Sequence, residues 1–342
     1  MSAGGGTKAI IAALGANLGI AATKFVAFLL TNSSSMLAES IHSVADSGNQ
    51  ALLLVGGRRA KRRATAAHPF GYGRERYIYA FIVAIVLFSL GGLFALYEAY
   101  HKFHDPHAIT AWKWVPVTVL VVAIALESYS FRTAIKESNH VRGTTSWVQF
   151  IRRAKAPELP VVLLEDAGAL IGLVFALFGV VMTLLTDNGM WDALGTAMIG
   201  LLLVAIAVLL AFETKSLLVG EGANPEDVEK IERAVLAGPG VERIIHMKTL
   251  HLGPEELLVA AKIAVPGTEL AADVARHIDE TEQRIRDALP IARVIYLEPD
   301  IYHPEQAPKR GSATSGATRV EFDGASGRSL NGAVPPNITG TA

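Results

Sequence analysis

Long apolar stretches, separated by short polar segments, fill residues 1–220 of this 342-residue chain. A stretch of about 20 apolar residues can cross the roughly 30 Å hydrocarbon layer of a bilayer as a helix. The pattern therefore predicts an α-helical membrane domain with six transmembrane helices. The six stretches are residues 9–30, 36–56, 78–100, 112–131, 161–185 and 190–212.

The pattern changes at Glu221, after which polar and apolar residues mix as in a soluble domain. Helical spacing over 224–236 and 269–288, and strand-like alternation over 241–252, 256–265 and 292–297, predict the order helix, strand, strand, helix, strand. Residues 221–300 are thus expected to form a small α+β domain with its helices on one face of a sheet. Residues 301–342, rich in Gly, Ser, Thr, Ala and Pro, are predicted to be a disordered tail.

Composition agrees with a membrane protein, because 51% of the residues are hydrophobic, only 18% are charged, and the mean hydropathy is +0.35. Cysteine is absent, which excludes disulfides, thiolate metal sites and cysteine nucleophiles. The first apolar stretch has no cleavage-type site after it, so we interpret it as a retained helix and not as a signal peptide.

Basic residues gather in two of the polar segments, between the second and third and between the fourth and fifth apolar stretches. By the positive-inside rule both segments are cytoplasmic, which places both termini and the α+β domain in the cytoplasm. Nucleic-acid binding is the less favoured interpretation, because these clusters adjoin the membrane spans. The short loops and the absence of a transit peptide indicate a bacterial inner membrane.

The most informative residues are Glu39, His42 and Asp46, which lie inside an otherwise apolar stretch. Spacings of three and four residues place them on one face of a helix. An ionisable group at the centre of a bilayer costs at least about 2.5 to 3.5 kcal/mol, so three such groups need a partner, water or a ligand. This face is therefore predicted to be a functional site.

A second acidic position lies in the fifth stretch, where Glu165 and Asp166 are adjacent. Glu165 is either an acid at the beginning of an interfacial helix or part of the site, whereas Asp166 is expected within the hydrocarbon layer. Together with His42 and Asp46, Asp166 would supply one imidazole and two carboxylates to a divalent cation. That donor set suits Zn²⁺ and, less selectively, Mn²⁺, Fe²⁺ or Co²⁺.

Imidazole and carboxylate ligands hold protons when no metal is bound, so metal binding expels protons and protonation expels metal. A cavity that opened alternately to each side would then let an inward proton gradient drive outward metal movement. No Walker-type phosphate loop is present, which gives no indication of ATP hydrolysis, and no His-Glu-x-x-His motif indicates a metallohydrolase. We expect a transporter that is not an enzyme and has no prosthetic group. A membrane-bound metal sensor or scaffold is the alternative.

The run Ser34-Ser35-Met36-Leu37-Ala38-Glu39-Ser40-Ile41-His42-Ser43-Val44-Ala45-Asp46-Ser47-Gly48-Asn49-Gln50, followed by His68-Pro69-Phe70-Gly71-Tyr72-Gly73-Arg74, resembles the cation diffusion facilitator family of zinc transporters. The resemblance covers about residues 8–299. It implies a homodimeric, proton-coupled antiporter that exports Zn²⁺ or a related divalent ion from the cytoplasm by alternating access. It also implies a ferredoxin-like cytoplasmic domain that helps the chain to dimerise.

In that resemblance the four-ligand site of the family falls on His42, Asp46 and Asp166, with Val162 at the fourth position. Valine cannot bind metal. Three replacements are open: Glu165 turns into the shell, water completes it, or Glu39 contributes. The Leu-Leu-Glu-Asp run at 163–166 is reminiscent of a divergent branch of the family whose metal is less settled.

The resemblance also places His246 and Glu298 near metal-ligand positions of the cytoplasmic domain. Tyr296 and Lys262 stand where two other ligands would be needed, which argues against metal sensing by that domain.

Other polar residues in the spans have structural explanations. Lys24 is expected either to snorkel or to pair with a neighbouring acid, and Asn17 and Asn49 are expected to make interhelical hydrogen bonds. Glu127 is expected to be solvated near a helix end. The segment 144–155 has the spacing of an interfacial amphipathic helix, or of a gate over the cytoplasmic mouth.

Overall fold

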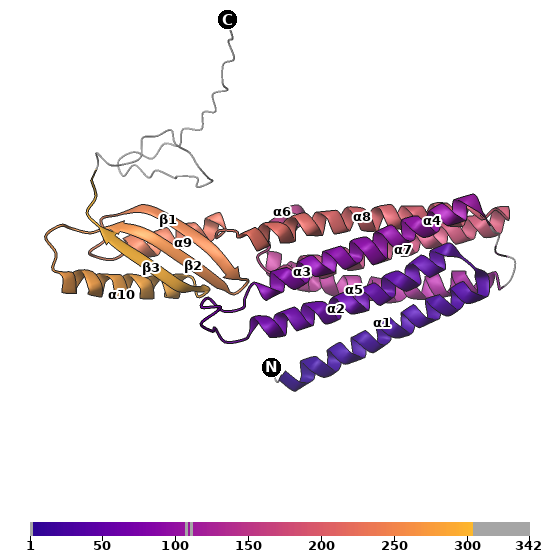
Figure 1. The fold of residues 1–342 in the computed structure, drawn as a ribbon, viewed down its shortest axis with the longest axis horizontal. Helices are drawn as coiled ribbons and strands as arrows, with labels where there is room; N and C mark the ends of the chain where they lie inside the picture. Colours follow the sequence, from indigo (N-terminus) through magenta and orange to yellow (C-terminus); the bar gives the residue numbers. More distant parts are fainter. Residues whose placement is uncertain (1–2, 107–108, 110–111, 304–342) are drawn as a thin grey trace, which may run out of the picture. The chain divides into compact units, whose positions relative to one another are not determined.

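The computed structural model describes residues 3–106, 109 and 112–303, with side chains from residue 17 onward. Long helices running alongside one another form its first part (Figure 1). Three segments, α3, η1 and α4, follow one another without a break, and η1 is a turn of π-helix. These elements are α1 (Ala3–Thr31), α2 (Ser34–Ala60), α3 (Glu75–Val86), η1 (Leu87–Leu93), α4 (Phe94–His104), α5 (Trp114–Arg142), α7 (Glu158–Thr186) and α8 (Met190–Val219).

Four of the predicted apolar stretches lie within α1, α2, α7 and α8, and the third runs through the continuous segments α3, η1 and α4. The fourth, residues 112–131, begins two residues before α5. By length and composition, four helices among the described residues could cross a membrane: Glu75–His104, Trp114–Arg142, Glu158–Thr186 and Met190–Val219. The segment Asn17–Thr31 is a shorter apolar helix. The helix α5 continues beyond the fourth apolar stretch, from residue 131 to Arg142.

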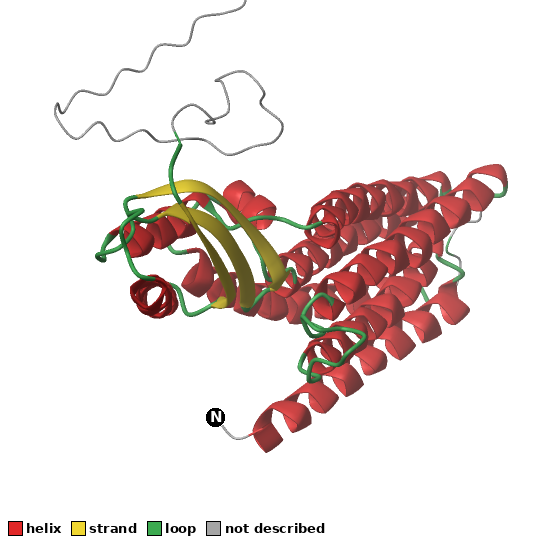
Figure 2. Ribbon diagram, turned by 60° about the vertical axis from the view of Figure 1, so that its left-hand side comes forward, coloured by secondary structure: helices red, strands yellow, loops and turns green. Residues whose placement is uncertain are grey.

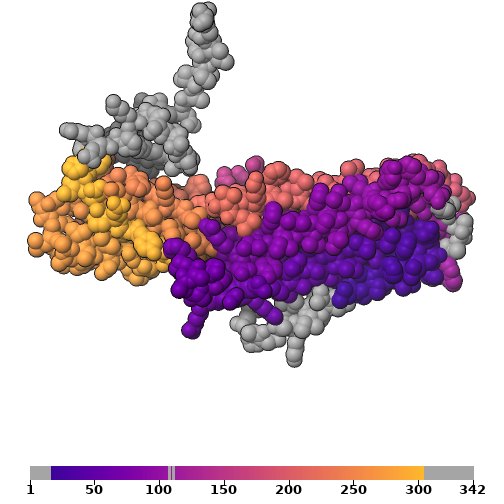
Figure 3. All heavy atoms as spheres, viewed as in Figure 1, coloured from indigo at the N-terminus to yellow at the C-terminus, as the bar shows by residue number. Residues whose placement is uncertain are grey.

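The helices pack closely, and two glycines show why. An added Cβ at Gly179 of α7 would lie 2.8 Å from the carbonyl oxygen of Trp191, and one at Gly195 of α8 would lie 2.8 Å from that of Phe175. The missing side chains let the backbones of α7 and α8 approach each other, as small residues do between membrane helices. In the space-filling view the side chains close the gaps that separate the ribbons on the face shown (Figure 3).

The N-terminus of α2 is held by a buried carboxylate from another helix. Asp192, in the first turn of α8, is fully buried. Its oxygens accept hydrogen bonds from the Ser33 hydroxyl at 2.9 Å, and from the Ser34 backbone N–H at 2.8 Å and hydroxyl at 3.1 Å. A negative charge at this place complements the helix dipole of α2 and satisfies backbone donors that have no partner within the helix. Asp192 therefore fixes one end of α2 to α8.

The short helix α6 (Trp147–Arg153) lies in the segment that was predicted to be amphipathic. Phe150 is buried, where it packs with Ala134 of α5 and Leu163 of α7. The Arg142 guanidinium lies 4.2 Å from the ring centroid of Trp147. The helix is thus confirmed, while its position at a membrane surface stays a prediction.

The second part of the structure is a three-stranded sheet with two helices (Figure 2). The strand order is β1-β2-β3, in which β1 and β2 are antiparallel and β2 and β3 are parallel. The predicted order helix, strand, strand, helix, strand is confirmed. The elements are α9 (Pro225–Leu236), β1 (Arg243–Gly253), β2 (Glu256–Ala264), α10 (Ala271–Ala288) and β3 (Ala292–Asp300).

Both helices cover the same face of this sheet. Alternate residues of β2, such as Leu257, Val259 and Ile263, are fully buried and share one core with Ile231 of α9 and Ile285 of α10. Alternation at a period of two turns every second strand residue toward the helices. The parallel pairing of β2 and β3 requires a crossover connection, which α10 supplies. The predicted tail, residues 301–342, lies outside the described residues beyond position 303.

His251 is a buried histidine at the end of β1. Its side chain is 2% exposed, and its Nδ1 atom lies 3.4 Å from the carbonyl oxygen of Gly253. Burial lowers the pKa of His251, because removal from water disfavours the charged imidazolium. The folded sheet therefore holds this side chain in its neutral form.

Replacing Asp192 with alanine should destabilise the helical domain. The substitution leaves the buried serine donors unpaired and removes hydrogen bonds to a charged acceptor, each worth about 1.5 to 3 kcal/mol. We expect a clearly lower melting temperature of the purified protein in detergent. Asp187→Asn is the control, because Asp187 is 73% exposed, pairs with exposed Lys113, and has a left-handed backbone conformation that asparagine tolerates. Equal melting temperatures for both variants would contradict the conclusion that Asp192 clamps the N-terminus of α2 to α8.

The sheet should lose stability in mild acid because of His251. Since the folded pKa is depressed, the unfolded chain binds the proton more readily, so stability is full above about pH 6.5 and falls as the pH decreases through that value. Hydrogen exchange of the β1 and β2 amides, measured at pH 7.5 and 5.5 with correction for intrinsic rates, should show less protection at the lower pH. His251→Leu should remove most of this difference. The exposed His246 on the same strand provides the control, His246→Leu.

Candidate metal centre

Glu39, His42 and Asp46 lie within the single helix α2, and His42, the middle one of the three, is buried. His42 is 1% exposed, and its Nδ1 atom lies 3.5 Å from Asp46 Oδ1, one helical turn further along. Neither imidazole nitrogen has a hydrogen-bond partner among the described residues, and neither has Asp46 Oδ1. Buried polar atoms are nearly always paired, so this cluster calls for a functional explanation. Imidazole nitrogen and carboxylate oxygen are ligands for divalent cations.

The π-helical turn lies beside His42. An added Cβ at Gly91, in η1, would lie 3.7 Å from His42 Nδ1 and 3.2 Å from a methyl group of Leu203. Glycine at this position leaves room beside the imidazole. Turns of π-helix inside α-helices often occur at functional sites, and here the turn faces the ligand atoms.

Glu39 lies on the same face but has a partner of its own. Its Oε2 atom lies 3.0 Å from the Lys24 ammonium of α1, which also donates a hydrogen bond of 2.8 Å to the Ser43 hydroxyl. Lys24 and Glu39 are both buried. Of the two expectations for Lys24, pairing with a neighbouring acid is confirmed, and snorkelling is wrong.

The two adjacent acids of α7 point in different directions. Glu165 is buried, and its Oε1 atom accepts a hydrogen bond of 2.7 Å from the Asn49 amide of α2. Asp166 instead accepts a hydrogen bond of 2.9 Å from the Ser130 hydroxyl of α5. The interhelical role expected for Asn49 is confirmed, as is that of Asn17, whose amide donates to Gln50 at 3.3 Å.

The structure therefore brings His42 and Asp46 together and turns Glu165 toward α2. Asp166 points to α5, and Glu39 to Lys24. In the part of the chain that the structure describes, no group of three or more His, Asp or Glu side chains is arranged to hold a metal ion. Val162, at the fourth position, packs against the apolar cluster around Phe150.

Glu127 of α5 is a further member of this region. It lies in the middle of α5 (Trp114–Arg142), so the expectation that it is solvated near a helix end is wrong. The sequence contained a usable signal, because Glu127 precedes Ser130 by three residues and so shares a helix face with the hydroxyl that holds Asp166.

The Asp192 clamp was also missed. The three serines at 33–35 ahead of an apolar helix signal a helix N-terminus. Nothing local identifies Asp192 as their partner.

On the sheet, His246, Lys262 and Glu298 form one row across the three strands. The Lys262 ammonium lies 3.2 Å from Glu298 Oε1 and 2.9 Å from Asp300 Oδ2. Hydrogen bonds to these acids raise the pKa of Lys262. An ammonium group thus already pairs with both carboxylates. That this domain does not sense metal stays a prediction.

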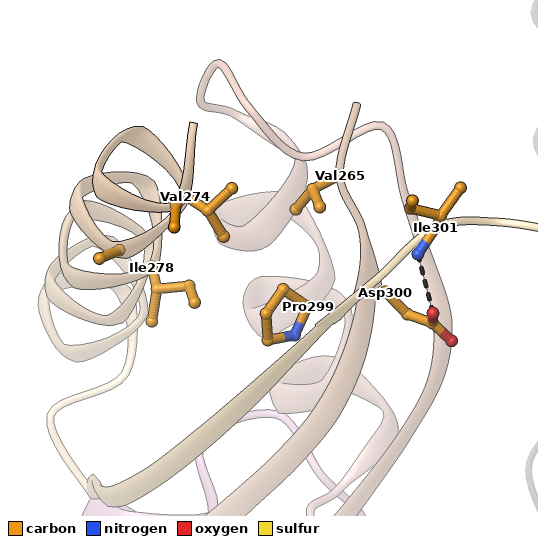
Figure 4. Close-up of a pocket in the computed structure, with 8 residues that line it drawn as sticks. Val265, Val274, Ile278, Pro299, Asp300 and Ile301 are labelled. Carbon is orange, nitrogen blue, oxygen red and sulfur yellow. Dashed lines mark hydrogen bonds between the residues drawn. The ribbon is translucent and has the colours of Figure 1, made fainter. Parts of the chain in front are cut away.

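A groove of about 520 Å³ lies between α10 and the ends of β2 and β3 (Figure 4). Val274 and Ile278 face Val265 and Pro299 across it, and its carboxylate, Asp300, accepts a 2.8 Å hydrogen bond from the Ile301 backbone. Its lining is largely aliphatic and provides no set of metal ligands.

Residues 10–219 match the family model described as the cation efflux transmembrane domain, and residues 223–300 match that of the cation efflux protein cytoplasmic domain. This chain belongs to the cation efflux family. The match confirms the resemblance to the cation diffusion facilitators. This cation efflux protein is accordingly a multi-pass membrane protein with a C-terminal cytoplasmic domain built on a small sheet.

Three curated relatives illustrate the range of the family. Over 247 residues the chain is 30% identical to the "Proton-coupled zinc antiporter SLC30A9, mitochondrial" of Xenopus laevis, covering 71% of this chain and 44% of that protein. It is 28% identical to "Metal tolerance protein C4" of Arabidopsis thaliana, covering 80% and 60%. It is 25% identical to "Metal cation efflux system protein CzcD" of Cupriavidus metallidurans, covering 75% and 76%. This cation efflux protein thus spans about half the length of the first of these relatives.

Proposed function

We propose that this cation efflux protein exports a divalent metal cation, with Zn²⁺ as its main substrate, in exchange for protons. The observation that carries the proposal is the pair of buried His42 and half-buried Asp46. Among the described residues, both His42 nitrogens and Asp46 Oδ1 have no hydrogen-bond partner, and His42 lies beside a π-helical turn. The name of the Xenopus relative, a proton-coupled zinc antiporter, supports the same exchange. Mn²⁺, Fe²⁺ and Co²⁺ are the other candidates for transport, because they accept the same donor atoms.

In the proposed site, His42 and Asp46 bind the cation first, because they already lie one turn apart on α2. Asp166 leaves the Ser130 hydroxyl and turns toward α2 to become the third ligand. Glu165, held toward α2 by Asn49, is a carboxylate that could replace the ligand missing at Val162. Binding therefore draws α7 toward α2 and away from α5.

Proton coupling follows from the chemistry of the ligands. His42 must be neutral and the aspartates ionised to bind metal, so protons that enter the site release the cation. If the site faces each side of the membrane in turn, an inward proton gradient drives export. The proposed location is a bacterial inner membrane, which sustains such a gradient.

Several features of the assembly belong to the same proposal. We assign α1 and α2 as two further spans, which gives six with both termini in the cytoplasm. The transport domain ends near residue 220, and residues 221–300 form a ferredoxin-like cytoplasmic domain through which the chain forms a homodimer. The mixed β1-β2-β3 sheet with both helices on one face supports this fold assignment.

Transport in proteoliposomes tests the function. The wild type should couple uptake of Zn²⁺, Mn²⁺, Fe²⁺ or Co²⁺ to proton flux, and Asp46→Ala and Asp166→Ala should each reduce that coupled flux by more than about tenfold, because each loses a ligand. Asp187→Ala is the control, since Asp187 is exposed at the end of α7. A wild type that binds metal but moves neither metal nor protons would identify a membrane-bound sensor or scaffold instead.

The Ser130 hydroxyl should compete with the metal for Asp166. Removing it by Ser130→Ala abolishes a hydrogen bond worth about 0.5 to 1.5 kcal/mol that binding has to break, so the affinity for Zn²⁺ should rise about two- to tenfold. Titration calorimetry of the purified protein measures this change. Ser128→Ala is the matched control, because the Ser128 hydroxyl donates its hydrogen bond to the Ile124 carbonyl of its own helix and not to Asp166. An unchanged or weaker affinity in Ser130→Ala would show that Asp166 does not move.

A further inference from the structure

Lys24 is a buried cation within hydrogen-bond distance of the predicted site. Its side chain is 1% exposed, and its ammonium lies between the Glu39 carboxylate at 3.0 Å and the Ser43 hydroxyl at 2.8 Å. Its charge also acts on His42 and Asp46. A lysine with water or headgroups in reach would turn its ammonium toward them. This one instead turns toward the same acidic face that is proposed to bind the metal.

The ion pair with Lys24 holds Glu39 through one oxygen, Oε2. The other oxygen, Oε1, has no hydrogen-bond partner among the described residues, and Gly172 of α7 leaves it room, because an added Cβ there would lie only 3.0 Å away. Glu39 is one helical turn from His42, close enough to reach a cation bound there if it were free to turn. Lys24 is the group that prevents this.

The pair of Lys24 with Glu39 adds no net charge to the site. The three ligands His42, Asp46 and Asp166 carry two negative charges when the imidazole is neutral, which matches a divalent cation. A freed Glu39 would add one negative charge and further oxygen ligands. A shell richer in oxygen favours Mn²⁺ over Zn²⁺, because Zn²⁺ prefers nitrogen and a low coordination number.

We propose that Lys24 determines metal preference by holding Glu39 away from the cation bound at His42 and Asp46. This inference rests on the proposed function and adds to it a residue on α1, a helix that contributes no ligand. It also removes Glu39 from the candidates for the position left open by Val162.

The test is titration calorimetry of the purified full-length protein with Zn²⁺ and Mn²⁺, which gives the ratio of the two dissociation constants. In Lys24→Gln the freed Glu39 should shift this ratio toward Mn²⁺ by about tenfold, at the lower end of the effects of groups around metal ligands. The double variant Lys24→Gln/Glu39→Gln should return the ratio to that of the wild type. Lys102→Gln is the control, because Lys102 is also buried but donates to the Asn32 carbonyl, away from the site.

Two results would overturn the inference while the proposed function stands. One is an unchanged ratio in Lys24→Gln, which would leave Lys24 a structural role only. The other is weakened metal binding in the double variant, which would make Glu39 a ligand of the wild-type protein. The double variant has an amide at both positions, and two amides can hydrogen-bond to each other without a buried unpaired charge. It therefore decides the question even if Lys24→Gln alone does not fold. Absence of metal binding and transport in the wild type would instead remove the proposed function itself.

Discussion

Burying ionisable side chains among apolar helices is the constraint on which this structure depends. In an apolar interior each buried charge or amide needs a partner from the protein, and the partners found here come from other helices. Lys24 pairs α1 with Glu39 of α2, Asn49 joins α2 to α7, and Asp192 joins α8 to the beginning of α2. All three connections include α2, which makes this helix the centre of the polar interactions as well as the carrier of His42 and Asp46.

The positions of the elements could be predicted from the sequence because their signals are local. Apolar stretches marked the helices, and alternation marked the three strands. The direction of the acids on α7 could not be predicted. Glu165 and Asp166 are neighbours, so about 100° of helix rotation separates them, and only the packing of α7 decides which one faces α2. The hydrogen bond between Ser33 and Asp192 joins residues far apart in the chain, so no local sequence pattern predicts it.

The candidate site combines a part that is already arranged with parts that have to move. His42 and Asp46 lie on one helix, so their spacing is set by the helix itself. Asp166 comes from a second helix and is hydrogen-bonded to a third. The proposed binding event thus changes contacts between helices, and this is the kind of change that can link occupancy of a site to a new arrangement of the whole domain. A site built on α2 alone would bind metal without that consequence.

Asp192 holds α2 at its N-terminal end, so a tilt of the helix around that point displaces its C-terminal end the most. Its 27 residues extend about 40 Å from the Asp192 clamp, whereas His42 lies only about 12 Å from it. A tilt of about 10° around the clamp would displace the far end by about 7 Å and His42 by only about 2 Å. A displacement of His42 around a bound ion is therefore magnified more than threefold where α2 ends at Ala60.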